Sequence, residues 1–262
     1  MKAAVIGFGK MGQAIAKGWI DKKVFRAEDI LASSGSYDKL MDACETLGTT
    51  PMPSNAEAIA NADLVILSVK PNMIKDALEG CIDLLQDDSK WIVCVAWGVY
   101  NDELDEIIPD SHHISMIPNT AIEIGQGIVI YEKVNTLTED QMIRFTELFE
   151  PVSMLVQTET KNMNTAGIIS GCAPAFTEMY LEALGDAGVK YGLKRDQAYL
   201  IAAKMIEGVG ALYLSKKDHP GMMKDDVCSP GGSTIRGVTQ LEKDGFRAAV
   251  ISAVEAIAEP GK

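Results

Sequence analysis

Short apolar runs alternate with helix-patterned stretches through the first 158 residues of the chain. Continuous apolar runs bounded by turn residues are typical of strands buried on both faces, whereas apolar positions that recur every three to four residues indicate helices. The expected strands are residues 3–6, 29–32, 64–69, 91–95, 114–117, 127–132 and 152–156, and the expected helices include 56–61, 74–85 and 138–149. This alternation predicts an α/β fold with a Rossmann-type, doubly wound parallel sheet, in which the later strands pair antiparallel at one edge.

Strand patterns end near residue 162, and the remaining sequence is patterned as helices. The expected helices are residues 166–191, with a kink at Pro174 and an end at Gly192, followed by 194–215, a short segment 219–227, 235–241 and 246–257. We therefore predict two domains, a nucleotide-binding domain over residues 1–158 and an all-helical domain over residues 159–262. Helices rich in small residues form only a thin apolar core by themselves. We therefore expect these helices to bury apolar surface in an intertwined homodimer.

A glycine turn joins the first strand to a helix. The sequence Gly7-Phe8-Gly9-Lys10-Met11-Gly12 follows the strand directly, and apolar residues then recur at helical spacing. Such a fingerprint uses its first glycine for a tight turn, its second for approach of a pyrophosphate and its third for helix packing. We expect all six residues to bind a dinucleotide at the helix N-terminus; the alternative is a plain glycine-rich turn.

The end of the second strand favours NADPH as the dinucleotide. An NAD site carries an acidic residue about 20 residues beyond the glycines, on the ribose 2′-hydroxyl. Here the chain has Ser33, Ser34, Gly35 and Ser36, with Lys39 nearby. Hydroxyls can donate hydrogen bonds to a 2′-phosphate, whereas a carboxylate would repel it. We therefore predict NADPH as the hydride donor, with NADH as a second hydride donor. The alternative is that these serines cap the helix expected to begin near Tyr37.

Three further strand ends place polar or small residues beside the cofactor. In a doubly wound sheet, ligands bind beyond the carboxyl ends of the strands. The segments that follow the strands are Val69-Lys70-Pro71, Ala96-Trp97 and Pro118-Asn119-Thr120. We therefore predict that Val69, Lys70, Pro71, Ala96 and Asn119 contact the cofactor. For Lys70 the alternative is a solvated helix cap.

A second glycine turn lies near the other end of the chain. Ser229-Pro230-Gly231-Gly232-Ser233-Thr234 runs directly into the apolar-periodic segment 235–241. Glycines let a ligand approach the backbone, and the first amides of a helix attract an anion. The run predicts a receptor for a small carboxylate at the amides of Gly232, Ser233 and Thr234, beside the Thr234 hydroxyl. The alternative is a helix start with an ordinary Ser or Thr cap.

Composition restricts the class of protein. The chain has 262 residues, 47% hydrophobic and 23% charged, and a net charge of −13, which argues against a nucleic-acid partner. Apolar stretches look too short for a bilayer, so we expect no membrane partner. Five cysteines without a CxxC pair suit free thiols in the reducing cytoplasm. Three histidines form no ligand cluster, and we predict no metal site; His219 is expected to be a solvated loop residue.

The second glycine turn resembles the C-terminal substrate segment of pyrroline-5-carboxylate reductases, and the match continues through Gly237, Val238, Leu241 and Glu242. The resemblance spans nearly the whole chain. It implies that Ser170 and Gly171, in a Ser-Gly-Cys-Ala-Pro-Ala stretch, and Asp226 and Gly231 lie beside the substrate. It further implies that Val69-Lys70-Pro71 contacts the nicotinamide half and that Asn55 lies near the adenosine ribose. The chain departs from the family at Ser115, where an arginine is common, and at Cys172 and Ala173.

The resemblance implies reduction of 1-pyrroline-5-carboxylate to L-proline, the last step of proline biosynthesis, in a homodimer that assembles into rings in some relatives. A cyclic imine carboxylate that arrives protonated needs no strong general acid, so Thr234 is the expected catalytic residue, through its bond to the ring nitrogen. Two interpretations stay open. One is another enzyme on the same scaffold, either a different imine reductase or a β-hydroxyacid dehydrogenase, and Lys161 and Asn164 are candidates for the catalytic pair of such a dehydrogenase. The other is a nucleotide-sensing protein without turnover.

Overall fold

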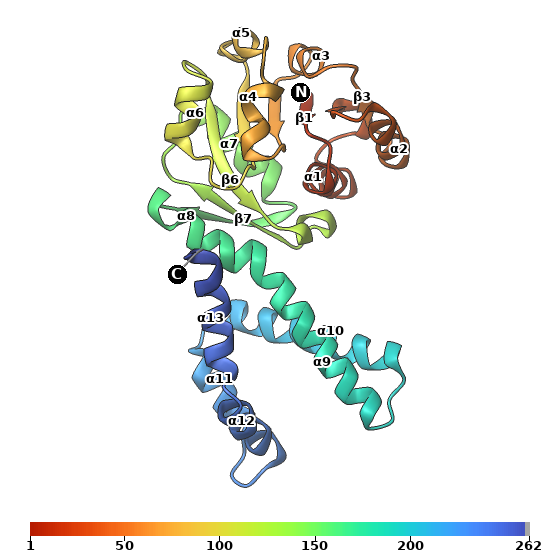
Figure 1. The fold of residues 1–262 in the computed structure, drawn as a ribbon, viewed down its shortest axis with the longest axis vertical. Coiled ribbons are helices and arrows are strands. Elements are labelled where there is room, and N and C mark those ends of the chain that lie inside the picture. Colours follow the sequence, from red (N-terminus) through yellow and green to blue (C-terminus); the bar gives the residue numbers. More distant parts are fainter. Residues whose placement is uncertain (260–262) are drawn as a thin grey trace. The chain divides into compact units, whose positions relative to one another are not determined.

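The structure is a computed structural model that describes residues 1–259 of the chain. It divides into two compact units, Met1–Gly171 and Cys172–Lys262. The first unit holds every strand among the described residues, and the second consists of helices and turns (Figure 1). The α/β class and the helical C-terminal domain are therefore confirmed, while the boundary between residues 158 and 159 stays a prediction.

The first unit is built on an eight-stranded sheet in the order β3-β2-β1-β4-β5-β6-β7-β8. The strands are β1 Ala3–Ile6, β2 Ile30–Ser33, β3 Thr50–Pro51, β4 Leu64–Leu67, β5 Trp91–Cys94, β6 His113–Pro118, β7 Gly127–Glu132 and β8 Ser153–Thr158. Strands β1 to β6 run parallel to one another, β7 pairs antiparallel with β6, and β8 runs parallel to β7. The expected antiparallel edge is thus confirmed at β6–β7.

Helices cover both faces of this sheet. They are α1 Lys10–Asp21, α2 Tyr37–Leu47, α3 Asn55–Ala60, α4 Ile74–Ala77, α5 Ile82–Leu85, α6 Asn101–Ile107, α7 Glu139–Phe149 and α8 Thr160–Gly167, with 3₁₀ turns at Ala27–Asp29, Pro71–Met73 and Thr120–Ile124. Alternate β1 residues enter two separate apolar clusters, because successive side chains of a strand point to opposite faces. Val5 packs with Trp19 of α1, and Ile6 lies in the cluster that contains Ile74.

The expected single helix over residues 74–85 was wrong. The structure breaks it into α4 and α5, and Gly80 between them has a φ of 71°, a left-handed conformation that interrupts a helix. The apolar periodicity on either side of Gly80 continues across the break, since both short helices pack their apolar residues against the same face of the sheet. Sequence periodicity alone therefore hid the interruption.

The second unit contains five helices among its described residues. They are α9 Ala173–Lys190, α10 Arg195–Lys216, α11 Pro220–Asp226, α12 Ser233–Lys243 and α13 Phe246–Ala258. A π-helix, Ile168–Cys172, precedes α9 where a proline kink was expected, and Pro174 falls in the first turn of α9, where it needs no amide partner. Gly192 has a φ of 96° and ends α9 as expected.

Helix α10 is 22 residues long and apolar enough, by length and composition, to cross a membrane. The expectation that no stretch reaches that length was therefore wrong. The apolar side chains of this helix are spread around its circumference, which also suits a helix that is covered by other protein on several sides. His219 is exposed in the loop before α11, as expected, and its Nδ1 also accepts a hydrogen bond from the Gly221 amide at 3.0 Å, which caps α11.

Candidate functional site

The glycine turn after β1 has the local geometry of a dinucleotide fingerprint. Gly7 has a φ of 90°, and a Cβ there would lie 2.6 Å from the Ser68 carbonyl oxygen. A Cβ on Gly12 would lie 2.9 Å from Val5, so α1 packs closely on β1. A Cβ on Gly9 would meet no protein atom within 4 Å. The turn and the packing thus account for the first and third glycines, and the space beside Gly9 is open to a ligand.

Backbone hydrogen bonds select which amides of this turn can receive an anion. The amides of Gly7 and Phe8 both donate to the Ser33 carbonyl at 3.0 Å, and the Gly9 amide donates to the Gly7 carbonyl at 2.8 Å. The first bond along α1 runs from the Gln13 amide to the Gly9 carbonyl. The amides of residues 10–12 therefore have no acceptor within the helix, and they form the anion receptor at its N-terminus.

The carboxyl end of β2 has a different arrangement from the one we expected. Ser33 is fully buried, and its hydroxyl donates to Asn55 Oδ1 at 2.7 Å, while Asn55 Nδ2 donates to the Ala77 carbonyl at 2.8 Å. Both ends of the Asn55 side chain are therefore engaged, and Ser33 and Asn55 hold this strand end in place. Ser34 is half-buried, and Ser36 is exposed and makes no cap bond to α2. Ser34 and Ser36 are the hydroxyls left for a phosphate.

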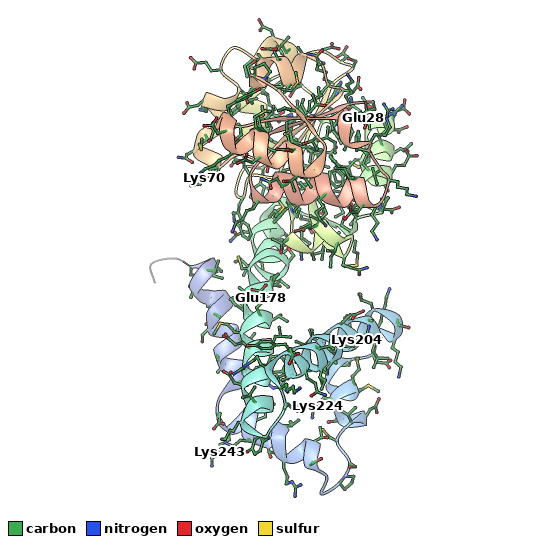
Figure 2. All side chains as sticks on the ribbon, turned by 90° about the vertical axis from the view of Figure 1, so that its right-hand side faces the viewer. Glu28, Lys70, Glu178, Lys204, Lys224 and Lys243 are labelled. Carbon is green, nitrogen blue, oxygen red and sulfur yellow. The ribbon has the colours of Figure 1, made fainter. Side chains whose placement is uncertain are left out.

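The segments after β4, β5 and β6 lie at the same carboxyl edge of the sheet. Val69 touches the glycine turn, because its Cγ1 lies 2.6 Å from the position of a Gly7 Cβ. Lys70 is exposed on this unit (Figure 2), and Pro71 begins a 3₁₀ turn. Ala96 is buried directly after β5, and Asn119 follows β6. The edge thus brings together the residues that were predicted from five separate segments of the sequence.

The Ser170 segment is connected to this edge within the first unit. Asn119 Nδ2 donates to the Ser170 carbonyl at 3.2 Å, and Asn119 Oδ1 accepts the Ile128 amide at 3.1 Å. Ser170 is buried within the π-helix, and Gly171 is exposed. A π-helix is rare and often marks a functional site, because it displaces the backbone locally from the regular helix. Asn119 therefore has a structural role that the sequence did not indicate.

The second glycine turn is a tight four-residue turn, Ser229 to Gly232. The Gly232 amide donates to the Ser229 carbonyl at 3.0 Å, Pro230 occupies the second position, and Gly231 has a φ of 70°. These are the features of a type II turn. A Cβ on Gly232 would lie 2.6 Å from the Ser229 hydroxyl, so both glycines are required by the turn itself. The Gly232 amide is thereby engaged and is not available to a carboxylate.

Helix α12 begins directly after this turn. Its N-cap Gly232 supplies no side-chain cap, and Ser233 and Thr234 are the first two residues of the helix, both exposed. Their amides have no partner within the helix. The alternative of a Ser or Thr cap is therefore not what the structure contains. Asp226 ends α11 and is exposed near the start of the same turn in sequence.

Three of the five thiols are buried in the first unit. All five cysteines are free, and burial raises the pKa of the Cys94 thiol to about 12. Burial also raises the pKa values of Cys44 and Cys81. Thiolates are the reactive form, so these three groups are inert at neutral pH. Among residues 1–259, no group of three or more His, Cys, Asp or Glu side chains is arranged to hold a metal ion.

Comparisons with known proteins match both parts of the chain. The family model described as pyrroline-5-carboxylate reductase dimerisation matches residues 160–262, and the one described as NADP oxidoreductase, coenzyme F420-dependent, matches residues 2–98. Pyrroline-5-carboxylate reductases of Treponema pallidum and Glycine max are 38% and 34% identical, covering 98% and 97% of this chain and 98% and 92% of those relatives.

A solved structure is similar over nearly the whole chain. The crystal structure of Plasmodium falciparum pyrroline carboxylate reductase with NADP bound is 27% identical. Its TM-score is 0.88, with 99% of this chain and 96% of that chain covered. The similarity therefore extends over both units of the chain.

Proposed function

The chain belongs to the pyrroline-5-carboxylate reductase family, and from this premise we propose how its own residues bind the reactants and promote the reaction. It is an NADP-dependent oxidoreductase of proline biosynthesis that reduces 1-pyrroline-5-carboxylate to L-proline. The full-length matches favour this activity over a β-hydroxyacid dehydrogenase and over a non-enzymatic nucleotide sensor. The single observation that carries the proposal is the uncapped start of α12 after the Ser229–Gly232 turn.

The cofactor half of the site lies at the carboxyl edge of the sheet. NADPH supplies the hydride when it is bound. The amides of residues 10–12 hold the pyrophosphate, Gly9 leaves room for it, and Ser34 and Ser36 face the 2′-phosphate. Val69 and Ala96 are small or apolar side chains that let the nicotinamide half approach strands β4 and β5.

The substrate half is formed by the start of α12. The amides of Ser233 and Thr234 bind the carboxylate, since a helix N-terminus favours an anion and these amides have no other partner in the helix. The Thr234 hydroxyl bonds to the ring nitrogen, which it reaches from the residue that also binds the carboxylate. Two contacts from adjacent residues fix the ring in one orientation, and orientation is the main source of rate for a protonated imine.

Other predicted features belong to the same proposal. Asp226 faces the cationic ring nitrogen of the substrate. The free thiols suit an enzyme of the reducing cytoplasm. The C-terminal family model supports a dimer, and we propose an intertwined homodimer through residues 159–262 that can assemble further into rings. The exposed apolar residues of the second unit support this assembly, because an unpaired unit would leave them in water.

The test is NADPH oxidation with a panel of five- and six-membered cyclic imine carboxylates. We expect turnover of 1-pyrroline-5-carboxylate and formation of L-proline. Thr234→Ala should lower kcat/KM about 10²-fold, the size of effect expected when the reacting ring loses a contact that orients it. Thr239→Ala is the matched control, because Thr239 lies on the same helix and bonds only to backbone carbonyls of its own helix. Unchanged kinetics of Thr234→Ala would remove Thr234 from the mechanism.

A further inference from the structure

The loop between β5 and α6, residues 95–100, is fixed to the rest of the first unit where it leads into α6. Ser115 is buried in β6, and its hydroxyl donates to the Val99 carbonyl at 2.7 Å. The Asn101 amide, at the start of α6, donates to the buried carboxylate of Glu132 at 2.8 Å. The backbone of this loop is therefore held firmly on the side that follows Ala96.

Trp97 provides a third connection, and it is the one that reaches the segment assigned to the substrate. Its indole Nε1 donates to Asn164 Oδ1 of α8 at 3.0 Å. A Cβ on Gly167 would lie 2.9 Å from Cη2 of this indole, and a Cβ on Gly171 would lie 3.5 Å from its Cζ3. The ring thus lies against two glycines, one at the end of α8 and one in the π-helix.

The contacts of Trp97 connect the two sides of the reaction site that belong to the first unit. The residue before it, Ala96, is assigned to the nicotinamide, and Gly171 is assigned to the substrate. A second contact acts in parallel, because Asn119 bonds to the Ser170 carbonyl. The hydrogen bond to Asn164 is exposed, so its own contribution to folding is small, while the ring also packs against the apolar cluster of Ile117, Ile130 and Met163.

We propose that Trp97 is a positioning residue for hydride transfer, and that it acts by holding the loop after β5 and the Ser170–Gly171 backbone at a fixed separation. The inference rests on the proposed function. Its physical basis is that a reacting pair must lie at about 3–3.5 Å, and that a misplacement of about 1 Å costs on the order of 100-fold in rate. The Trp97–Asn164 hydrogen bond fixes the orientation of the indole. Packing on Gly167 and Gly171 fixes how closely the ring approaches the backbone of these two residues.

The experiment compares Trp97→Phe, Asn164→Leu, the double variant and Asn164→Asp. Trp97→Phe removes the donor but keeps an aromatic ring, and Asn164→Asp keeps an acceptor. We expect Trp97→Phe and Asn164→Leu each to lower kcat roughly tenfold, with KM for NADPH unchanged within about twofold. The double variant should lose no more than either single one, because both substitutions break the same bond. Asn164→Asp should retain most of the activity.

Asn162→Leu is the control for the substitution itself, since Asn162 is an exposed asparagine of the same helix whose side chain bonds to no described residue. The kinetic isotope effect on kcat with NADPH deuterated at the transferred hydrogen should rise in Trp97→Phe, because hydride transfer becomes slower relative to product release. A loss of stability alone would not change this isotope effect.

Two failures are distinguishable. If the wild-type enzyme reduces cyclic imines but Trp97→Phe and Asn164→Leu match the kcat and isotope effect of Asn162→Leu, the positioning role is overturned and the proposed function stands. If the wild-type enzyme binds NADPH and reduces none of the imines, the proposed function is overturned.

Discussion

The three glycines of the first turn differ in what an added methyl group would meet. At Gly7 it would meet the Ser68 carbonyl in a left-handed backbone conformation, and at Gly12 it would meet Val5. At Gly9 the backbone has a φ of −84°, which any residue adopts, and no protein atom lies within 4 Å. Folding therefore constrains the first and third glycines, and ligand binding constrains the second.

Gly9→Ala should separate these two effects. We expect the free energy of unfolding in urea to change by less than about 1 kcal/mol, because the added Cβ meets open space. We expect the Kd for NADPH to rise at least about tenfold, because the Cβ occupies the approach of the pyrophosphate. Gly7→Ala is the contrast and should lose both stability and binding. Wild-type NADPH affinity in Gly9→Ala would contradict the assignment of this turn.

Ser34 is the residue at which we expect cofactor preference to be decided. The Ser33 hydroxyl is bonded to Asn55, whereas Ser34 is half-buried at the strand end. Ser34→Asp should lower the ratio of kcat/KM for NADPH to that for NADH at least about tenfold, because a carboxylate repels the 2′-phosphate. NADH turnover in the same variant is the internal control, and an unchanged ratio would place the 2′-phosphate elsewhere.

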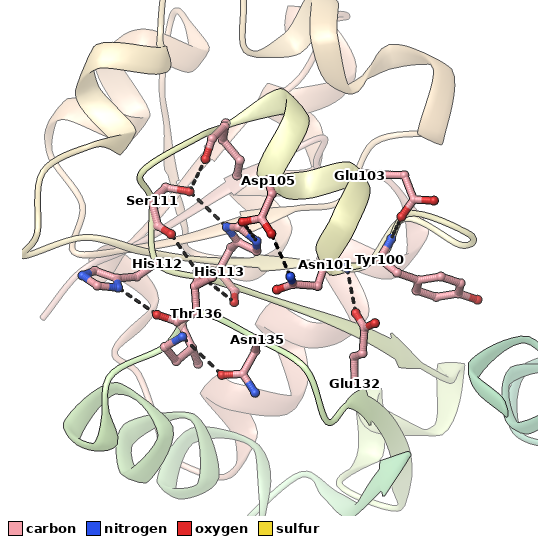
Figure 3. A network of polar contacts seen from close by, with 12 residues as sticks. Tyr100, Asn101, Glu103, Asp105, Ser111, His112, His113, Glu132, Asn135 and Thr136 are labelled. Atoms are coloured by element: carbon pink, nitrogen blue, oxygen red, sulfur yellow. Dashed lines mark hydrogen bonds and ion pairs between the residues drawn. The ribbon is translucent and has the colours of Figure 1, made fainter. Parts of the chain in front are cut away.

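At the scale of elements, a buried polar network joins β6, α6 and β7 (Figure 3). His113 is fully buried in β6, with Nδ1 3.1 Å from the Ser111 hydroxyl and Nε2 3.4 Å from Asp105 Oδ1. Asn101 bridges to Asp105 through its side chain and to Glu132 through its amide. Burial lowers the pKa of His113, although Asp105 opposes this effect. The folded state therefore favours neutral His113 more strongly than the unfolded chain does.

This depressed pKa predicts a pH dependence of stability. As pH falls through about 6.5, the unfolded chain takes up a proton that the folded His113 does not, so the free energy of unfolding falls until the folded pKa is reached. His113→Gln should flatten this slope between pH 7.5 and 5.5 in urea unfolding, by about 1.4 kcal/mol for each unit by which the pKa is lowered. His112→Gln, at the half-buried neighbour, is the control. Equal slopes in all three proteins would contradict the prediction.

The elements that the sequence predicted best are those whose bounds are set by local sequence signals. Strand β7 has the expected bounds, and α2 begins at Tyr37 as expected, since strand alternation and a polar start are local signals. The break at Gly80 and the π-helix at Ile168–Cys172 were not predicted. Both interrupt helices without interrupting the apolar pattern, so only the backbone conformation reveals them.

At the scale of the whole molecule, the second unit lacks a core of its own. Among its described residues only Gly185, Ala198 and Ala202 are buried, whereas Leu200 of α10 is 72% exposed. An apolar groove of about 480 Å³ lies between α9, α12 and α13 and is lined by residues such as Phe176 and Val250. Dimer formation would cover this apolar surface, which agrees with the dimerisation family model that matches this unit.

The dimer gives a prediction for this surface. The double substitution Leu200→Glu and Val209→Glu should shift the sedimentation coefficient toward that of a monomer, because burying two carboxylates at an apolar interface is unfavourable. Gln197→Glu, at the polar start of the same helix, is the charge control. We expect the monomer to keep NADPH binding, since the glycine turn lies in the first unit. A dimer that persists in the double variant would place the interface elsewhere.

The sequence predicted the positions of both glycine turns but not how the site is held together. Short motifs such as Gly7–Gly12 and Ser229–Thr234 specify their own backbone, so they are visible without a structure. The contacts of Trp97 with Asn164, and of Ser33 with Asn55, join residues 67 and 22 positions apart. Such pairs depend on the tertiary fold, and no local pattern predicts them.

Transfer of deuterium from NADPH to the product tests the proposed reaction most directly. NADPH deuterated at the hydride-donating carbon is incubated with the enzyme and 1-pyrroline-5-carboxylate, and the product is analysed by mass spectrometry and NMR. We predict L-proline with one deuterium on the ring carbon that was double-bonded to nitrogen, formed in equal amount to oxidised cofactor. Oxidation of NADPH without labelled L-proline, or no reaction by an enzyme that binds both compounds, would contradict the account.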